Sequence, residues 1–180
     1  MSDATRQSDK PDARFDTLFL EHWHATYRVL MRLVGDHAEA EDLALETFWR
    51  FYRRAPQGEV SIGGWLYRVA TNLGLNALRA RKRRTQHELQ AGVWDIETKT
   101  IDPAQIVADE EERARVRQVL SEMDARQAQL LILRHSGMAY AELAQTLGVA
   151  PTSIGTLLAR AEREFESRYR WTASPFGKGE

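Results

Sequence analysis

The sequence predicts an all-α fold, made of two small helical domains joined by a flexible linker. Alanine (23 residues) and leucine (19) far outnumber valine (9) and isoleucine (6), which favours helices over strands. No segment shows a sustained alternation of apolar and polar residues. The five prolines all fall between segments of helical periodicity, as expected because a proline inside a helix removes a hydrogen bond and clashes with the preceding turn.

Three helices are predicted in the first half of the chain. Apolar residues recur there at spacings of three and four, which gives each helix one buried face. The expected helices cover residues 15–34, 38–54 and 62–84, with a loop rich in proline and glycine at 55–63. We predict that they pack into one three- or four-helix bundle, residues 13–87.

The second half is predicted to be a separate helical unit. Helical periodicity fades after residue 87, where glycine, proline and scattered charges are typical of a tether. The periodicity returns further on, first in a helix with Val116, Val119 and Leu120, then in a short one with Leu130 and Leu131. The predicted segments are a tail at 1–12, a linker at 88–104, a second domain at 105–168 and a tail at 169–180.

The charges are unevenly distributed, although 25 Lys and Arg against 26 Asp and Glu leave a net charge of −1 over 180 residues. Residues 36–46 contain five acids and no Lys or Arg, and residues 61–87 contain six bases and no acid. The acids are Asp36, Glu39, Glu41, Asp42 and Glu46, and the bases are Arg68, Arg79, Arg81, Lys82, Arg83 and Arg84. An acidic helix followed by a basic one indicates a surface for a cationic partner and a surface for a polyanion. A solvated helix face is the alternative for the acidic stretch.

One side of the third predicted helix combines side chains that suit nucleic-acid binding. At 100° per residue, one narrow sector holds Trp65, Arg68, Asn72, Asn76 and Arg79. Asparagine pairs with base edges, arginine with phosphate or guanine, and an aromatic ring stacks on an unpaired base. For Trp65 a packing role is the alternative, because a single tryptophan near a helix start usually packs.

Residues 138–165 fit a helix-turn-helix. Leu143 and Leu147 are expected to face inward, Ala144 is small where the helices cross, and Gly148 suits the left-handed turn. An ordinary helical hairpin is the alternative, although it has no special use for Ala144 or Gly148. The outward residues of the second helix are predicted to be Thr152, Ser153, Gly155, Thr156, Ala159, Arg160 and Arg163, which offer hydroxyls, small surfaces and guanidinium groups to a major groove.

The sequence carries no sign of catalysis or of a cofactor. Its zero cysteines exclude disulfides, thiolate metal sites and thiol nucleophiles, and its five histidines are dispersed. No phosphate-binding glycine loop and no cluster of metal ligands is present, so we expect no catalytic residue, no metal and no cofactor. The polar N-terminus and the lack of a long apolar run predict neither a signal peptide nor a membrane span, and the expected compartment is the cytoplasm.

Three segments together resemble the extracytoplasmic-function (ECF) subgroup of bacterial RNA polymerase sigma factors. They are DHAEAEDLALETF at 36–48, GWLYRVATNLGLNALRARKRR at 64–84 and the helix-turn-helix at 138–165. The first two are highly specific in combination, whereas many regulators share the third. The resemblance implies a sigma-two domain at 13–87 and a sigma-four domain at 105–168, joined by the linker, and it covers residues 13–168.

The resemblance also implies a partner for each surface. The acidic helix would dock on the clamp helices of the polymerase beta-prime subunit, and the second domain on the beta flap. The residues implied at the core polymerase are Asp36, Glu39, Glu41, Asp42, Glu46 and Trp49. Those implied at the −10 promoter element are Trp65, Arg68, Asn72, Asn76, Arg79, Arg81, Lys82 and Arg83, with loop 55–63 capturing an extruded base. The outward residues of the helix-turn-helix would read the −35 element. An anti-sigma factor is a further implied partner, although no residue identifies one.

The helix-turn-helix departs from the family pattern at Gly155, Thr156 and Leu157, where Lys or Arg, then Ser, then Arg is usual. This departure predicts either an unusual −35 sequence or a weak −35 contact. Two other functions stay open. One is a DNA-binding repressor or activator that uses the helix-turn-helix alone, with the first domain as a dimerisation or ligand-binding unit. The other is a chain that serves mainly as an anti-sigma target or sequesters polymerase.

Overall fold

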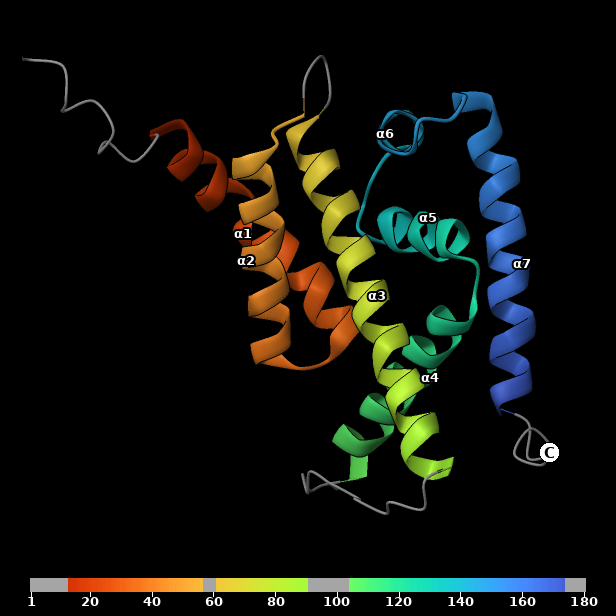
Figure 1. The fold of residues 1–180 in the computed structure, drawn as a ribbon. Helices are drawn as coiled ribbons and strands as arrows, with labels where there is room; N and C mark the ends of the chain where they lie inside the picture. Colours follow the sequence, from red (N-terminus) through yellow and green to blue (C-terminus); the bar gives the residue numbers. More distant parts are fainter. Residues whose placement is uncertain (1–12, 57–60, 91–103, 174–180) are drawn as a thin grey trace, which may run out of the picture.

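All regular elements within residues 13–56, 61–90 and 104–173, which the computed structural model describes, are helical (Figure 1). They are α1 (Ala13–Val34), α2 (His37–Arg53), α3 (Ile62–Gln90), α4 (Ala104–Glu122), α5 (Ala125–His135), α6 (Tyr140–Leu147), a 3₁₀ turn (Pro151–Ser153) and α7 (Ile154–Ala173). The predicted all-α fold class is confirmed. The predicted tail at 1–12, residues 57–60 of the loop at 55–63 and most of the linker lie outside the described residues.

The sharp connection between α1 and α2 follows from two residues. Gly35 has φ of 73°, a left-handed conformation that favours glycine, and its N–H donates to the carbonyl of Met31 at 2.9 Å. Asp36 then caps α2, because its side chain accepts a hydrogen bond from the Glu39 N–H at 2.9 Å. The two helices pack against each other, and Ala40 and Ala44 of α2 are completely buried.

Helix α3 is the central element of the fold (Figure 1). It packs against α1 and α2 on one side and against α4, α5 and α6 on the other. The sequence predicts that it ends at residue 84, but it continues to Gln90 and so includes the start of the predicted linker. Its most deeply buried large residues are Leu66, Leu75 and Leu78, whereas Leu73 and Ala77 are half-buried. Because α3 is covered from two sides, its buried residues do not form one simple stripe.

Caps also define the helices of the second half. Asp124 begins α5, since its carboxylate accepts hydrogen bonds from the N–H groups of Arg126 (2.9 Å) and Gln127 (3.3 Å). Gly148 ends α6 with φ of 66°, as the sequence predicts, and the following Val149 N–H donates to the Ala144 carbonyl at 3.0 Å.

One continuous hydrophobic core extends through both halves of the chain. It includes Leu30 and Leu75 from the first three helices and Val119, Met123 and Leu133 from the later ones, all of them at most 3% exposed. A second, smaller cluster around Phe48, Phe51 and Leu66 lies between α1, α2 and α3. In this structure the two predicted domains therefore form a single packed body. The domain boundaries stay a prediction.

Candidate polymerase and nucleic-acid interfaces

Three of the predicted acidic residues are used within the fold. Asp36 caps α2, as described above. Glu46 accepts a hydrogen bond from Arg50 of the next turn at 2.8 Å, and Glu39 pairs with Arg81 of α3. The Glu39–Arg81 pair joins α2 to α3, whereas the contacts of Asp36 and Glu46 lie within α2.

The other predicted residues of α2 lie on its solvent face. Glu41 and Asp42 are exposed, and Trp49 is 53% exposed, which is unusual for a tryptophan. Leu45 and Tyr52 are exposed on the same side, at 52% and 61%. These five residues, which we call the α2 face, join two carboxylates to a patch of large apolar side chains.

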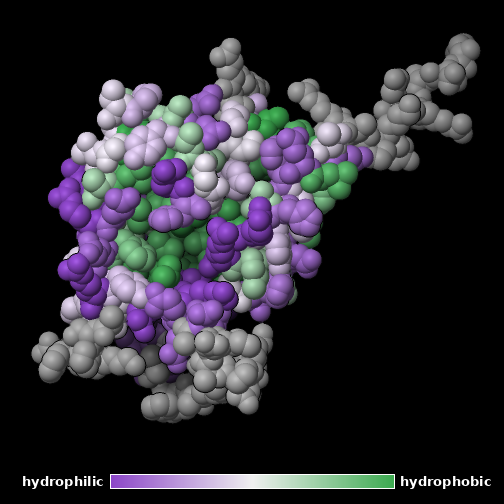
Figure 2. All heavy atoms as spheres, turned by 180° about the vertical axis from the view of Figure 1, so that it is seen from behind, coloured by the Kyte–Doolittle hydropathy of each residue, from purple (hydrophilic) through white to green (hydrophobic). Residues whose placement is uncertain are grey.

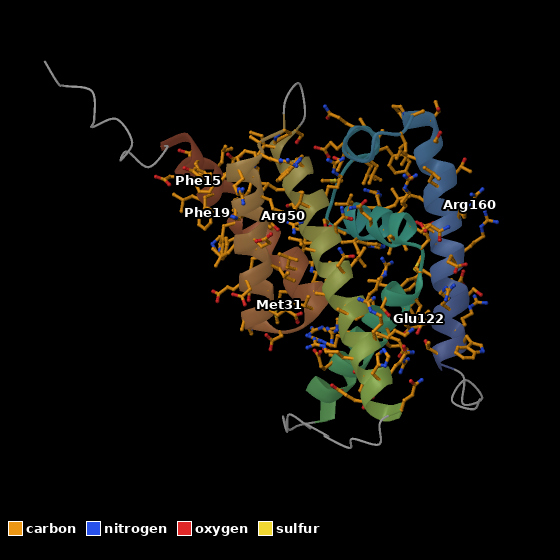
Figure 3. All side chains as sticks on the ribbon, in the orientation of Figure 1. Phe15, Phe19, Met31, Arg50, Glu122 and Arg160 are labelled. Atoms are coloured by element: carbon orange, nitrogen blue, oxygen red, sulfur yellow. The ribbon has the colours of Figure 1, made fainter. Side chains whose placement is uncertain are left out.

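Aromatic rings extend the α2 face onto α1. Trp49 stacks on Tyr52 with ring centroids 5.9 Å apart, and Phe15 meets Tyr52 edge-on at 5.4 Å. Figure 3 shows Phe15 and Phe19 on α1 beside α2, and together with Leu45 and Trp49 they line a shallow groove of about 650 Å³. The sequence reasoning missed Leu45 and Tyr52. Their spacing from Trp49, four and three residues, could have identified an apolar stripe beside the one that contains Phe48.

A second hollow, which we call the α2–α3 groove, is basic and aromatic. Its volume is about 840 Å³, and its lining residues are Glu46, Trp49, Arg50, Arg53, Arg54, Trp65, Arg68, Val69 and Asn72. Trp65, Arg68 and Asn72 belong to the predicted sector of α3. Arg50, labelled in Figure 3, Arg53 and Arg54 come from the end of α2 and were not predicted. The sequence feature that could have predicted them is this group of three arginines after the acidic stretch.

Trp65 combines the two roles that the sequence left open. Its ring is half-buried and packs edge-on against Phe51, with centroids 5.7 Å apart. The remainder of the ring lines the α2–α3 groove. Packing therefore fixes the orientation in which Trp65 faces the groove.

The predicted sector of α3 also contacts the second half of the chain, which the sequence did not predict. Arg68 donates a hydrogen bond to the carbonyl of Thr146 in α6 at 3.2 Å. The amide nitrogen of Gln129 in α5 donates to Asn72 Oδ1 at 2.8 Å and to the Arg68 carbonyl at 3.2 Å. Gln129 is 7% exposed, whereas its partner Asn72 is exposed, so these contacts lie at the edge of the buried region.

Two bases near the end of α3 contact the turn that joins α4 to α5. The Arg79 guanidinium donates to the carbonyls of Ser121 (3.3 Å) and Met123 (2.9 Å). Lys82 forms an ion pair with Glu122 at 2.8 Å. Figure 3 shows Glu122 at the contact of α4 with α3.

The remaining predicted bases and Asn76 differ in their surroundings. Arg81 donates to the carbonyl of Val34 at 2.9 Å and pairs with Glu39, so it ties α3 to the end of α1 and to α2. Asn76 and Arg83 are exposed. Adjacent members of the basic stretch therefore face different environments.

The helix-turn-helix has the predicted geometry. Leu143, Ile154 and Ala161 are completely buried, and Ala144 and Leu158 are 3% exposed. Six of the outward residues predicted from the sequence are exposed: Thr152, Gly155, Thr156, Ala159, Arg160 and Arg163. Ser153 is half-buried. Figure 3 shows Arg160 projecting from α7 away from the other helices.

The surroundings of two tyrosines raise their pKa values. Burial raises the pKa of Tyr67 in α3, and the positive charge of Arg28 offsets part of that rise. The pKa of Tyr169 in α7 is raised mainly by its hydrogen bond to Glu112 of α4. Both phenols stay protonated at neutral pH, so Tyr169 acts as a hydrogen-bond donor between α7 and α4.

The side chains described in the structure include no group of three or more His, Asp and Glu that would hold a metal ion. None of the described helices is long and apolar enough to cross a membrane.

Two family descriptions match the chain, one in each half. Residues 18–84 match "Sigma-70 region 2", and residues 113–165 match "Sigma-70, region 4". The first match contains the α2 face and the α2–α3 groove, and the second contains the helix-turn-helix.

Curated relatives share about a third of the sequence. The ECF RNA polymerase sigma factor SigE of Mycolicibacterium smegmatis is 31% identical over 151 residues, which cover 83% of this chain and 58% of SigE. The RNA polymerase sigma-H factor of Pseudomonas aeruginosa is 31% identical over 163 residues, 85% of this chain and 83% of that protein. This chain thus spans little more than half of SigE but most of sigma-H.

Among the solved structures that share the fold are RpoE and CnrH. The sigma factor RpoE, in complex with the anti-sigma factor NepR from Bartonella quintana, has a TM-score of 0.53 at 23% identity and matches 87% of this chain and 97% of its own. CnrH, in complex with the cytosolic domain of CnrY, has a TM-score of 0.56 at 17% identity, with 87% and 88% of the two chains covered.

Proposed function

Because the chain belongs to the sigma-70 family of RNA polymerase sigma factors, and within it to the extracytoplasmic-function subgroup, we propose that it directs core RNA polymerase to specific promoters and helps to open the −10 region. The observation that carries this proposal is the succession of the α2 face, the α2–α3 groove and the helix-turn-helix along one chain. In this role the chain makes and breaks no covalent bond, since RNA synthesis belongs to the polymerase.

The α2 face is the proposed contact with the beta-prime clamp helices of the polymerase. An exposed tryptophan flanked by carboxylates is typical of a protein interface, where aromatic side chains supply the affinity and charges supply the orientation. Trp49 is the central anchor, and Asp42 supplies charge at its edge. Glu39 and Glu46, which already have partners in the bundle, contribute mainly by holding this surface in place. The beta flap is the proposed contact of the second half.

The α2–α3 groove is the proposed site for the unpaired −10 strand. Its arginines Arg50, Arg53 and Arg54 supply positive charge for phosphates, and Trp65 supplies an aromatic surface. Stacking on an aromatic ring contributes about 1–3 kcal/mol per base, which offsets part of the cost of extruding a base from the duplex. Loop 55–63, whose residues 57–60 lie outside the described residues, lies in sequence between Arg54 and Trp65 of this groove.

The outward face of α7 is the proposed reader of the −35 element. Its hydroxyl groups and two arginines lie on the side opposite to the buried Ile154 and Leu158. Gly155 has no side chain, so it leaves the backbone bare near the start of α7. The space beside it is open, because a Cβ built there would meet no atom within 4 Å. This helix therefore suits close approach to a groove, with Arg160 and Arg163 contacting phosphates or guanines.

An anti-sigma factor is a proposed regulatory partner. The RpoE and CnrH structures described above are both complexes, one with an anti-sigma factor and one with the cytosolic domain of CnrY. Viewed from behind, the molecule shows hydrophobic atoms in a hollow surrounded by hydrophilic ones (Figure 2). A cleft of about 430 Å³ between α1, α4, α5 and α7 is lined by the apolar residues Val29, Leu33, Val116, Leu120, Leu131, Ile132 and Phe165. Such a cleft suits the apolar face of a helix from that partner.

Transcription with purified components tests the proposed function. The full chain is mixed with polymerase core free of other sigma factors and with genomic DNA, and the 5′ ends of the transcripts are sequenced. We expect ends preceded by shared −10 and −35 sequences.

Asp42→Lys should lower core binding at least about tenfold. Glu111→Lys, which makes the same charge change on an exposed residue of α4, should leave core binding unchanged. A stand-alone regulator would bind duplex DNA without polymerase and would be indifferent to Asp42→Lys.

A further inference from the structure

We propose that the α2–α3 groove binds a free nucleotide, and that its preferred ligand is a guanosine 5′-polyphosphate such as GTP. The volume of the groove is about 840 Å³, within the roughly 300–1,000 Å³ that is typical of small-molecule sites. The binding itself is independent of the proposed function. Its consequence rests on that function, because a bound nucleotide would occupy the groove proposed for the unpaired −10 strand.

The groove carries more positive charge than a single DNA strand requires. Arg50 is paired with Glu46 at 2.8 Å, so these two charges largely neutralise each other. Three further arginines line the groove: Arg53, Arg54 and Arg68. Within the part of the chain that the structure describes, no carboxylate lies within 4.0 Å of these three guanidinium groups. A DNA backbone presents one phosphate charge per nucleotide, whereas a 5′-polyphosphate gathers several on one nucleotide and so matches these arginines better.

Two of these arginines are accessible to a ligand at the end of α2. The side chains of Arg53 and Arg54 are exposed. The backbone beside them is held in place, because the Arg54 N–H donates to the Arg50 carbonyl at 2.9 Å. A guanidinium group suits phosphate because its planar fork donates two parallel hydrogen bonds. We therefore assign the phosphates of the nucleotide to Arg53 and Arg54.

Aromatic rings from two helices provide the surface for the base. Trp65 of α3 is half-buried, and its edge-on contact with Phe51 at 5.7 Å between ring centroids fixes its orientation. Trp49 of α2 lines the same groove and is 53% exposed. A free base can stack on such a ring, because every base has an aromatic face.

The polar groups beside Trp65 favour guanine over adenine. Asn72 Oδ1 already accepts a hydrogen bond from Gln129 at 2.8 Å, so the amide NH₂ of Asn72 is the group left for a ligand. Arg68 spends one nitrogen on the Thr146 carbonyl at 3.2 Å, and its other N–H groups are donors as well. Guanine presents two acceptors, N7 and O6, on one edge, whereas adenine presents an acceptor and a donor there. A groove that offers donors therefore suits guanine.

A nucleotide in this groove would compete with the −10 strand. The same arginines and the same ring would serve both ligands, so they cannot be bound together. By mass action, GTP at ten times its Kd should weaken strand binding about tenfold. The supply of guanine nucleotides would thus set how much of the chain is free to engage a promoter.

Titration calorimetry of the full-length chain with GTP, at low ionic strength, measures the binding. We expect one saturable site. Guanosine, which lacks the phosphates, and tripolyphosphate, which lacks the base, should each bind at least about tenfold more weakly than GTP. ATP should bind at least about fivefold more weakly, because it lacks the second acceptor of the guanine edge.

Variants of the groove test the assigned residues. Arg53→Ala/Arg54→Ala and, separately, Trp65→Ala should each lower the affinity for GTP at least about tenfold. The matched control is Arg113→Ala/Arg126→Ala, which removes the same charge from exposed sites of α4 and α5 and should leave GTP binding unchanged. Circular dichroism verifies that each variant is folded. The arginine pair keeps the test valid if Trp65→Ala unfolds, since both arginines are exposed.

Two further measurements locate the nucleotide. A photoreactive azido analogue of GTP should cross-link to peptides that contain residues 49–54 or 65–72, as identified by mass spectrometry. Unlabelled GTP should displace a short fluorescein-labelled single strand of mixed sequence, followed by anisotropy. GTP that binds but leaves the strand in place would contradict the competition.

The outcomes separate this inference from the proposed function. Absence of saturable GTP binding, equal affinity for tripolyphosphate, cross-links only at other segments, or unchanged binding by Arg53→Ala/Arg54→Ala overturns the nucleotide site. Equal affinity for ATP overturns the assignment of the guanine edge. GTP binding without promoter-dependent transcripts would uphold the site and refute the sigma-factor role, and transcripts without GTP binding would do the reverse.

Discussion

Arg81 and Arg83 lie two residues apart in one basic stretch, and the structure predicts different consequences for their loss. Arg81 donates to the Val34 carbonyl at the end of α1 at 2.9 Å and pairs with Glu39 of α2. Arg83 is exposed. Replacing Arg81 by alanine should therefore destabilise the first three helices, whereas Arg83→Ala should weaken DNA binding without changing stability.

The magnitude follows from the two contacts that Arg81→Ala removes. A charged hydrogen bond to a carbonyl contributes about 1 kcal/mol here, below the usual range for charged groups because the Arg81 side chain is 46% exposed. The ion pair with Glu39 adds about 0.5 kcal/mol, as is usual for partly exposed pairs. The free energy of unfolding should thus fall by about 1.5 kcal/mol, which lowers Tm by about 3–6 °C for a chain of this size.

Thermal unfolding followed by circular dichroism, alongside strand binding by anisotropy, measures both effects. Arg83→Ala is the matched control, with the same loss of charge on the same helix. If Arg81→Ala left Tm unchanged and weakened strand binding as much as Arg83→Ala does, the assignment of Arg81 to the bundle would be wrong.

Three further variants test other parts of the fold and of the site. Ile154→Ala should lower the free energy of unfolding by about 2–5 kcal/mol in urea titrations, because Ile154 is completely buried between α6 and α7; a smaller loss would contradict its place in the core. Gly155→Ala should raise stability by about 0.5–1 kcal/mol, since its Cβ meets no atom within 4 Å, and a lowered Tm would contradict this. Trp49→Ala should weaken binding to core polymerase by about 2 kcal/mol while Tm stays unchanged, because the ring is 53% exposed. If the Trp49→Ala variant bound core polymerase with unchanged affinity, Trp49 would not belong to the interface.

The helices could be predicted from the sequence because each buries a stripe of apolar residues at helical spacing. This periodicity located α1, α2 and the helix-turn-helix within a few residues, and Gly148 marked the end of α6 correctly. It failed at the end of α3, which runs to Gln90, because its last turns are polar and carry no such stripe.

The chemistry of the surfaces was also partly predictable, but the use of individual residues was not. Five bases in six residues indicate a basic surface, whereas the packing of neighbouring helices decides that Arg81 reaches Val34 and that Arg83 reaches solvent. The basic residues Arg50 and Arg53 were missed because the α2–α3 groove forms only when two helices meet.

The contact between the two halves could not be read from the sequence at all. It joins residues far apart in the chain, such as Asn72 and Gln129, through polar groups that give no periodic signal. A glutamine at position 129 is compatible with an exposed site as well as a buried one, and only the approach of α3 to α5 buries it.

The measurement that tests the central claim most directly is transcription by sigma-free core polymerase on genomic DNA, with and without the full-length chain. The account predicts transcripts that appear only with the chain, whose 5′ ends follow shared −10 and −35 sequences, and that are lost with Asp42→Lys but kept with Glu111→Lys. A chain that neither binds core polymerase nor changes the transcripts would contradict it.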